Sequence, residues 1–308
     1  MTQLATGGPA RLRGGDFLDL AQLELEELES ILDLASEIKN GRWHGEPLRG
    51  RTLALIFQKP SMRTRVSFEV GVGRLGGRTV ALGDHEIGFG RREDPADVAR
   101  VLDRYVDGIV ARLFAHDHLL RLAAASQRPV INALTDASHP CQVLADVMTM
   151  REALGRLDGT RRVAFVGDGN NVVRSLIQAS ALVGFPLTVV SPPAYRPRPE
   201  DLAAAPSVRV TEDLAAVEGA AVVYTDVWTS MGQEEEAEAR RAQFAEYQVN
   251  RRLMALAPEA YFMHCLPAHR GEEVTDEVID GPRSLVFQQA GNRLYAQMAL
   301  LALIYGDD

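Results

Sequence analysis

Cysteine is scarce in this sequence, which has 308 residues but only Cys141 and Cys265. Two cysteines provide neither the framework of a disulfide-rich domain nor a cluster with metal-ligand spacing. Long apolar runs are also missing, since no stretch approaches the roughly 20 residues that a membrane-spanning helix needs. We therefore expect a soluble, cytoplasmic protein with no disulfide scaffold, no metal site and no membrane contact.

Positive charge is in short supply as well. The 33 lysine and arginine residues are outnumbered by 42 aspartate and glutamate residues, which gives a formal net charge of −9. Because such a chain is not generally attracted to polyanions, we expect no nucleic-acid partner, and any anionic ligand must be held by a local basic cluster. Residues 1–17 include two arginines but no apolar core like that of a secretory signal, so we expect a disordered leader there.

What the sequence does contain is an alternation of short apolar runs with helix-like segments. This pattern predicts an α/β fold in which parallel sheets are flanked by helices. We expect two domains, residues 1–148 and 149–289, and a C-terminal helix within residues 290–308 that packs back on the first domain. The expected strands are 52–57, 79–82, 108–114, 129–134, 161–167, 187–191, 207–211, 220–228, 261–266 and 284–289. The main expected helices are 20–40, 61–75, 95–106, 118–126, 139–155 and 292–305, and a solvated helix start is expected at 234–241.

The segment "KPSMRTR", residues 59–65, concentrates three cations directly after an expected strand. Ser61 suits the N-cap of the helix that follows. The first-turn N–H groups of that helix lack intrahelical partners, and together with the hydroxyls of Ser61 and Thr64 and the guanidinium of Arg63 they favour an anion. Arg65 lies two positions after Arg63, so we expect it to face away and to serve packing or an ion pair. A solvated charged face explains the segment equally well at this point.

Two further patterns place reactive side chains where a helix begins or a strand ends. In "HPCQ", Pro140 suits the first helical position, so that His139 and Gln142 face one cleft and could hold a carbonyl oxygen and an amide; a simple helix cap is the alternative. Asp226 and Cys265 each lie at the end of an expected strand, where α/β folds bind ligands. The acid could hold a cationic amine there, whereas the thiol could equally be inert filler.

The loop "VGDGNNVV" is similar to a dinucleotide-binding loop but does not meet its requirements. Gly167 and Gly169 fit, yet Val172 occupies the third glycine position, and no acidic residue closes the next expected strand. A nicotinamide-dependent dehydrogenase is therefore disfavoured. The turn instead offers Asn170 and Asn171 as polar contacts.

Seven segments taken together resemble the aspartate/ornithine carbamoyltransferase family. They occur in order over about residues 53–302 and read "FQKPSMRTRVSFEVGVGRLGG", "DGIVAR", "HPCQVLAD", "VGDGNNV", "DVWTSMGQ", "HCLPAHRGEEVT" and "VFQQAGNRLYAQMALL". Each segment is weak alone, whereas seven in order are very specific. The "DVWTSMG" and "HCLP" segments are similar to the ornithine branch, because the aspartate branch is expected to have proline at Cys265 and no SMG turn.

The resemblance implies one domain that binds carbamoyl phosphate, one that binds ornithine, no cofactor, and a homotrimer with active sites between subunits. It implies transfer of the carbamoyl group to the side-chain amine of L-ornithine, which gives L-citrulline and phosphate. The implied catalytic residues are Arg63, Arg112, His139, Asp226 and Cys265. The implied phosphate ligands are Ser61, the Met62 backbone, Arg63 and Thr64, and those of the carbamoyl group are Arg112, His139, Gln142 and Arg293. The implied ornithine ligands are Asn171, Asp226, Ser230 and Met231, with Cys265 and Leu266 where the substrates meet.

Two positions depart from the family pattern. Threonine is usual where Met62 stands, although a main-chain donor survives this change. Glutamine is common where Glu86 stands, and glutamate near a phosphate dianion is unfavourable unless an arginine such as Arg91 or Arg92 screens it. Glu86 is therefore not among the expected ligands.

Two other interpretations of the resemblance are possible. The chain could carbamoylate another amine, such as putrescine or an N-acylated ornithine, but the SMG turn argues against this. It could instead be a non-catalytic carbamoyltransferase-like scaffold, which would be expected to lose Arg63, His139 or Cys265. All three are present.

Overall fold

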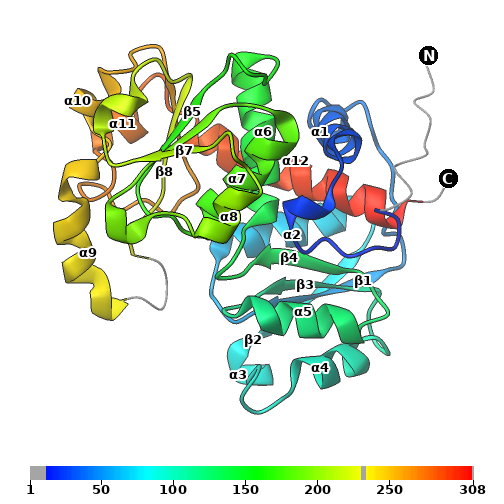
Figure 1. Ribbon diagram of the computed structural model, residues 1–308. Coiled ribbons are helices and arrows are strands. Elements are labelled where there is room, and N and C mark those ends of the chain that lie inside the picture. Colours follow the sequence, from blue (N-terminus) through cyan, green and yellow to red (C-terminus); the bar gives the residue numbers. More distant parts are fainter. Residues whose placement is uncertain (1–11, 230–233, 307–308) are drawn as a thin grey trace. The chain divides into compact units, whose positions relative to one another are not determined.

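The computed structural model describes residues 12–229 and 234–306 and divides the chain into two compact units (Figure 1). Unit 1 comprises the chain up to Ala145 together with the segment from Arg293 onward, and unit 2 comprises Asp146–Asn292. The division falls inside two helices, α6 (Pro140–Leu154) and α12 (Val286–Tyr305), so each helix contributes to both units. The C-terminal part of α12 packs on unit 1, as the sequence predicted.

Unit 1 is built on a four-stranded parallel sheet in the order β2-β1-β3-β4. The chain order reverses between β1 and β3, and Phe57 pairs with Arg112 at the carboxyl ends of these two strands. The loops that follow β1 and β3 therefore lie side by side at a topological switch point, where α/β sheets bind ligands. The strands are β1 (Thr52–Phe57), β2 (Arg78–Gly83), β3 (Gly108–Arg112) and β4 (Val130–Leu134).

Helices cover both faces of the unit 1 sheet, with α4 and α5 on one face (Figure 1). Ala54 and Ile56 of β1 point toward these two helices and share a buried cluster with Val98 and Leu119. The start of α4 is fixed by Asp94, whose carboxylate accepts the N–H of Ala96 at 2.9 Å. The helices are α1 (Leu25–Lys39), α2 (Met62–Arg74), α3 (Asp84–Ile87), α4 (Pro95–Leu102) and α5 (His116–Ala125).

Unit 2 is built on a five-stranded parallel sheet in the order β7-β6-β5-β8-β9. Here the chain order reverses between β5 and β8, so the loops after these strands form a second switch point. Thr225 pairs with His264 at the carboxyl ends of β8 and β9. The strands are β5 (Val163–Val166), β6 (Leu187–Val190), β7 (Arg209–Thr211), β8 (Val222–Thr225) and β9 (Tyr261–His264).

The helices of unit 2 are mostly short. One face of its sheet, including Val166 and Val223, buries its side chains against Phe244 and Leu253. The helices are α7 (Asn171–Val183), α8 (Pro199–Ala203), α9 (Ala237–Phe244), α10 (Arg251–Met254) and α11 (Asp276–Ile279). Among the described residues of the whole chain, no helix combines the length and apolarity needed to cross a membrane.

The strand expected at 284–289 is wrong. Only Ser284 forms an isolated bridge, with Phe262, and the chain becomes helical at Val286. The helix predicted from residue 292 therefore begins earlier, and the N–H of Gln289 already donates to the carbonyl of Leu285 at 2.8 Å. A short apolar run fits a buried strand and a buried helix equally well, and the glutamines that follow it have good helix propensity.

Part of the expected disordered leader is ordered. Phe17 is fully buried, its N–H donates to the carbonyl of Val130, and its carbonyl accepts the N–H of Asn132 at 2.8 Å. Residues 12–17 are therefore anchored beside β4, while residues 1–11 lie outside the described part of the chain. Nothing in the local sequence signals this pairing, because its partner is more than 100 residues away.

The helix expected at 20–40 is shorter than predicted. It begins at Leu25, and Leu20–Gln22 forms a separate 3₁₀ turn. The break is stabilised by Glu27, whose carboxylate accepts the N–H of Glu24 at 2.8 Å. A side-chain contact of this kind at a helix start favours a new N-terminus over continuation of the preceding turn.

Candidate active site

The carboxyl end of β1 leads into a helix start that is suited to an anion. Ser61 is the N-cap of α2: its Oγ accepts the N–H of Thr64 at 3.3 Å and donates to Thr64 Oγ1 at 3.1 Å. The remaining first-turn N–H groups, beginning with Met62, lie at the positive end of the helix dipole. Arg63 is half-buried in the same turn. This turn therefore presents main-chain, hydroxyl and guanidinium donors together.

Arg293, on α12, joins this helix start to the start of α6. Its Nη2 donates to Thr64 Oγ1 at 2.7 Å, and its Nη1 donates to Gln142 Oε1 at 2.7 Å. All three side chains are buried. The guanidinium thus cross-links α2, α6 and α12, and it brings together three of the residues that the sequence predicted for this site.

The pKa of His139 shows the electrostatic character of this cluster. Burial lowers the pKa of His139 well below its usual value, and the charges of Arg293, Arg112, Arg63 and Lys59 lower it further. The imidazole is therefore neutral at neutral pH and still able to donate a hydrogen bond. Four cations around one neutral ring make this part of unit 1 attractive to a multivalent anion, although the whole chain is acidic.

Lys59 is a member of this cationic cluster that the sequence analysis did not assign to the site. Its side chain is only 7% exposed, and its Nζ lies 4.6 Å from the centroid of the Phe114 ring. Arg112, the last residue of β3, is buried to the same extent. The basic run at residues 59–65 signalled the charge, but only the fold shows that the lysine points inward.

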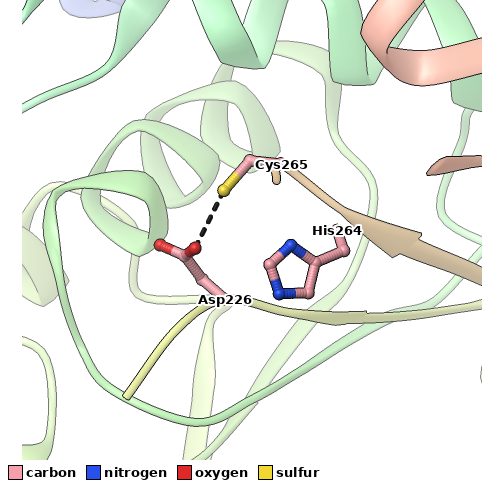
Figure 2. Close-up of side chains that lie close together, drawn as sticks. All are labelled: Asp226, His264 and Cys265. Carbon is pink, nitrogen blue, oxygen red and sulfur yellow. Dashed lines mark hydrogen bonds between the residues drawn. The ribbon is translucent and has the colours of Figure 1, made fainter. Parts of the chain in front are cut away.

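At the switch point of unit 2, Asp226 accepts hydrogen bonds on both carboxylate oxygens. Cys265 Sγ donates to Oδ1 at 2.9 Å, as Figure 2 shows, and Asn170 Nδ2 donates to Oδ2 at 2.8 Å. Because Thr225 pairs with His264, the next residue on each strand is brought into contact. The acid and thiol that the sequence predicted separately are therefore partners, while Asn170, noted as a polar contact, is the N-cap of α7.

The segment that carries Cys265 is held by the ring of His264. The N–H of Leu266 donates to Nδ1 of His264 at 2.9 Å, and Nε2 lies 3.1 Å from the buried carboxylate of Glu273. Nδ1 is therefore the acceptor, and Nε2 carries the proton. Leu266 has a φ of 56°, which is costly for a side chain with a Cβ, so these contacts also stabilise a strained backbone.

A buried ion pair flanks the same switch point. Arg240 Nη1 donates to Asp168 Oδ2 at 3.0 Å and to the carbonyl of Trp228 at 3.0 Å. Burial raises the pKa of Asp168 to about 6, and the charge of Arg240 opposes this rise. The expectation of a solvated helix start at 234–241 is wrong for Arg240, which is 6% exposed, because a distant carboxylate draws it inward.

Several predicted residues lie at the edge of these clusters or outside the described part of the chain. Asn171 is the first residue of α7 and is half-buried. Met62 is 71% exposed. Arg65 pairs with Glu69 at 2.8 Å, the ion pair that the sequence allowed for. Ser230 and Met231 lie outside the described residues.

Glu86, the second departure from the family pattern, makes local contacts. Its carboxylate accepts the N–H of Gly83, and its main-chain carbonyl accepts from the guanidinium of Arg92. Arg91 pairs instead with Asp84 at 2.6 Å. Arg92 thus bonds to the carbonyl of Glu86, and the carboxylate serves as a cap for α3.

Asp226, His264 and Cys265 lie close enough together to be considered as metal ligands (Figure 2). Both ring nitrogens of His264 already have protein partners, and the Cys265 thiol donates to Asp226. The same atoms therefore form a connected hydrogen-bond arrangement in which the carboxylate and the thiol face each other. That arrangement suits the orientation of a ligand amine.

The glycines of the "VGDGNNVV" loop serve turn geometry and close packing. Gly167 has a φ of 140°, which is unfavourable for other residues. Gly169 donates its N–H to the carbonyl of Tyr195 at 2.8 Å, and a Cβ placed on it would lie 2.4 Å from the nitrogen of Pro197. The loop thus has a structural need for both glycines.

Comparisons with known proteins agree with the two clusters. A family model described as "Aspartate/ornithine carbamoyltransferase, carbamoyl-P binding domain" matches residues 15–152, and a second, described as "Aspartate/ornithine carbamoyltransferase, Asp/Orn binding domain", matches residues 160–304. The first includes Lys59, Arg63, Arg112 and His139 of the cationic cluster in unit 1, whereas Arg293 falls in the second. The second includes Asp226 and Cys265.

Individual relatives match over nearly the whole chain. Ornithine carbamoyltransferase from Symbiobacterium thermophilum is 50% identical and covers 95% of this chain and 98% of its own length. Among solved structures, ornithine carbamoyltransferase from Pyrococcus furiosus has a TM-score of 0.92 and 47% identity, and covers 97% of this chain and 100% of that chain. The Thermus thermophilus ornithine carbamoyltransferase has a TM-score of 0.86 and 45% identity, with 94% and 97% coverage. This protein therefore belongs to the aspartate/ornithine carbamoyltransferase family.

Proposed function

We propose that this protein transfers the carbamoyl group of carbamoyl phosphate to the side-chain amine of L-ornithine, giving L-citrulline and phosphate. The observation that carries the proposal is that each unit of this family member holds a cluster of a different charge. Unit 1 holds four cations around His139, and unit 2 holds Asp226 between Asn170 and the Cys265 thiol. The first suits a phosphorylated anion, and the second suits a cationic amino compound.

Carbamoyl phosphate is assigned to residues 1–148 with the helix inside 290–308. Its phosphate takes the first turn of α2, where the donors converge. Its carbamoyl group takes the residues at the end of β3, at the start of α6 and on α12. Support comes from the two bonds of Arg293, which tie both groups of residues into one buried cluster. The proposed phosphate ligands are Ser61, the Met62 backbone, Arg63 and Thr64, and the proposed carbamoyl ligands are Arg112, His139, Gln142 and Arg293.

Ornithine is assigned to residues 149–289. The side-chain amine is the group that reacts, and Asp226 and Cys265 are the residues proposed to orient it. Support comes from the 2.9 Å contact between the thiol and the carboxylate at the ends of adjacent strands. The remaining proposed ligands are Asn171, Ser230, Met231 and Leu266.

The chemistry follows from the charges that develop during transfer. Attack of the amine on the carbamoyl carbon places negative charge on the carbonyl oxygen, and fixed donors such as Arg112 and neutral His139 stabilise it most at that moment. The C–O bond to phosphate then breaks, the leaving phosphate takes the proton that the attacking nitrogen gives up, and the resulting HPO4²⁻ dianion stays beside Arg63. The attacking amine must first lose a proton, which costs roughly 4–5 kcal/mol at pH 7 for an amine with a pKa near ~10.4. The proposed role of Asp226 and Cys265 is to orient the amine or to relay that proton.

A homotrimer with active sites between subunits is part of the proposal. The exposed face of α2 carries Met62, Val66 and Val70 at successive turns, and the edge strand β2 exposes Val80. Apolar side chains gathered on one helix face favour association with a second copy. Light scattering should give a trimer for the wild type, and Val66→Glu should shift it toward monomer; a monomeric wild type would contradict the assembly.

The catalytic proposal is tested by a panel of amine acceptors. Purified protein and carbamoyl phosphate are incubated with ornithine, N-acetylornithine, putrescine and aspartate in parallel, and the carbamoylated products are measured. We expect citrulline from ornithine and at most traces from the others. Activity with a different amine and none with ornithine would select one of the alternative carbamoyltransferases, and no activity with any amine would favour the scaffold.

A cytoplasmic location belongs to the same proposal. Cys141 and Cys265 are both buried, and neither forms a disulfide, which fits a reducing compartment. Fractionation of the source cells with an antibody to the protein would test this assignment, and recovery in an extracellular or membrane fraction would contradict it.

A further inference from the structure

A buried hydrogen-bond cluster lies directly behind the Asp226–Cys265 pair and is centred on Gln289 of α12. Gln289 Oε1 accepts the N–H of His264 at 3.0 Å. Its Nε2 donates to Asp146 Oδ1 at 2.8 Å and to the Tyr224 hydroxyl at 3.0 Å. All four residues are fully buried, so their polar groups hydrogen-bond to one another instead of to water: Gln289, Asp146, Tyr224 and His264.

The carboxamide of Gln289 bridges the two strands that carry the proposed ornithine ligands. Tyr224 lies on β8 two residues before Asp226, and His264 lies on β9 one residue before Cys265. One end of the carboxamide contacts each strand. The relative position of the carboxylate and the thiol, which meet at 2.9 Å, is therefore set from behind by one side chain.

Asp146, on α6, fixes which way this carboxamide points. Its two oxygens accept from Gln289 Nε2 and from the Tyr224 hydroxyl, the latter at 2.9 Å. Burial first, and the negative charge of Asp146 second, raise the pKa of Tyr224 well above its usual value, so the phenol remains a donor. With Nε2 committed to Asp146, only Oε1 of Gln289 is left to receive the N–H of His264.

Stability alone does not require this arrangement. A buried carboxylate with polar partners commonly contributes less than well-packed apolar residues of similar volume. What the polar cluster adds is direction, since hydrogen bonds fix orientation where apolar contacts do not. The strained backbone at Leu266, immediately after Cys265, is a place where such fixed orientation is needed.

We propose that Gln289 is a positioning residue for carbamoyl transfer: through the N–H of His264 and the hydroxyl of Tyr224 it holds Cys265 and Asp226 in the geometry that orients the ornithine amine. The proposal rests on the proposed function for its kinetic consequence. Its geometric consequence, the placement of the Cys265 thiol, does not depend on any activity.

The main test compares Gln289→Leu with Gln288→Leu. Gln288 is the neighbouring residue, is exposed, and donates to Glu152 at 2.7 Å, so it controls for loss of a glutamine on the same turn. For Gln289→Leu we expect kcat/KM for ornithine to fall about 10- to 100-fold while the KM for carbamoyl phosphate changes less than about twofold. Gln288→Leu should change neither by more than about twofold. Gln289→Glu keeps the acceptor for His264 but sets a second carboxylate against Asp146, so it should not recover the loss.

The second measurement is the alkylation rate of Cys265 by iodoacetamide in the full-length protein, followed by mass spectrometry. Cys141 is an internal reference, because burial raises its pKa to about 12 and leaves it unreactive. We expect Gln289→Leu to speed alkylation of Cys265 roughly fivefold or more by releasing the thiol from Asp226. An unchanged alkylation rate in a folded variant would overturn the positioning role even if no citrulline is ever detected.

A further variant keeps the test decisive if Gln289→Leu misfolds. Tyr224→Phe removes only the hydroxyl that Gln289 and Asp146 share, and should lower kcat/KM for ornithine about 3- to 10-fold. If Gln289→Leu does not fold, an unaltered Tyr224→Phe enzyme overturns the proposal. In either variant, a rise in the KM for carbamoyl phosphate as large as the fall in kcat/KM for ornithine would also overturn it, because such a result indicates general damage. A wild type that makes no citrulline removes the proposed function but leaves the alkylation test decisive.

Discussion

The carboxyl edges of the two sheets are built alike and charged oppositely. In each unit a parallel sheet reverses its strand order, and side chains at the ends of the central strands gather beside a helix N-terminus. In unit 1 the gathered groups are cationic, including Arg112 and Lys59, whereas in unit 2 they are the carboxylates of Asp168 and Asp226 with a thiol. The same arrangement of strands and helix N-terminus thus suits two kinds of ligand, and the charge of the side chains decides which kind each unit favours.

The comparison predicts that damage to one edge leaves the other ligand's binding intact. Asp226→Asn removes the negative charge that faces the amine, so kcat/KM for ornithine should fall about 1000-fold, or ~4 kcal/mol, while carbamoyl phosphate binds as in the wild type. Steady-state kinetics and calorimetric titration measure the two quantities. Asp213→Asn, which removes an exposed negative charge in the same unit while keeping a helix cap, is the control.

If Asp226→Asn weakened both ligands equally, the two edges could not be assigned separately. If ornithine turnover were unchanged, the carboxylate would have no role in orienting the amine.

On the cationic edge, Arg63→Ala and Arg65→Ala form a matched pair. The half-buried Arg63 belongs to the cluster around His139, whereas Arg65 is exposed and paired with Glu69. Arg63→Ala should lower kcat/KM for carbamoyl phosphate roughly 300-fold, or about 3.4 kcal/mol, and Arg65→Ala less than about twofold. Binding of carbamoyl phosphate and thermal unfolding are measured together, since Arg65→Ala acts on helix stability. Similar retention of binding in both variants would refute the anion site.

The smallest expected effect is on the pH dependence of the free energy of unfolding, and it involves unit 2 alone. Burial raises the pKa of Asp168 from 3.8 to about 6, so the folded protein binds this proton more tightly than the unfolded chain does. The contribution of Asp168 is therefore most favourable below pH 4 and is lost as the pH rises through 6, by about 3 kcal/mol in total. Urea unfolding of wild type and Asp168→Asn at several pH values should show this difference in slope.

Wild type and Asp168→Asn will also differ in the free energy of unfolding by an amount that does not change with pH. That difference reflects the lost contact with Arg240 and is not the quantity tested. Asp117→Asn, at an exposed position of α5, should run parallel to the wild type. Parallel curves for Asp168→Asn as well would mean that Asp168 stays ionised throughout the range.

Sequence patterns predicted the parts of the molecule that depend on local chemistry. The strand at 52–57 has the predicted ends because its apolar run is bounded by polar residues, and α2 starts at the predicted cap because Ser61 has a local partner in Thr64. The motifs also identified Arg293 and Gln142, which lie in contact although 151 residues separate them.

The structural features that the sequence did not predict share a physical cause. Gln289 and Arg240 are polar residues on helices, and such residues are usually exposed, so the sequence gives no sign that a distant carboxylate has drawn them inward. The apolar run at 285–287 failed for a related reason, because strand and helix differ there only in long-range pairing. Local sequence therefore shows which groups are available, while the fold decides which of them are buried together.

Gly169 has a consequence for anyone who reads sequence variation in this loop. The backbone at Tyr195 and Pro197 passes so close to it that a Cβ on residue 169 would clash. In a library that randomises every position of the loop, residue 169 should tolerate glycine alone, even under selection for folding without activity. An invariant position of the segment would then be one without a side chain, and invariance there would measure how closely two stretches of backbone pass.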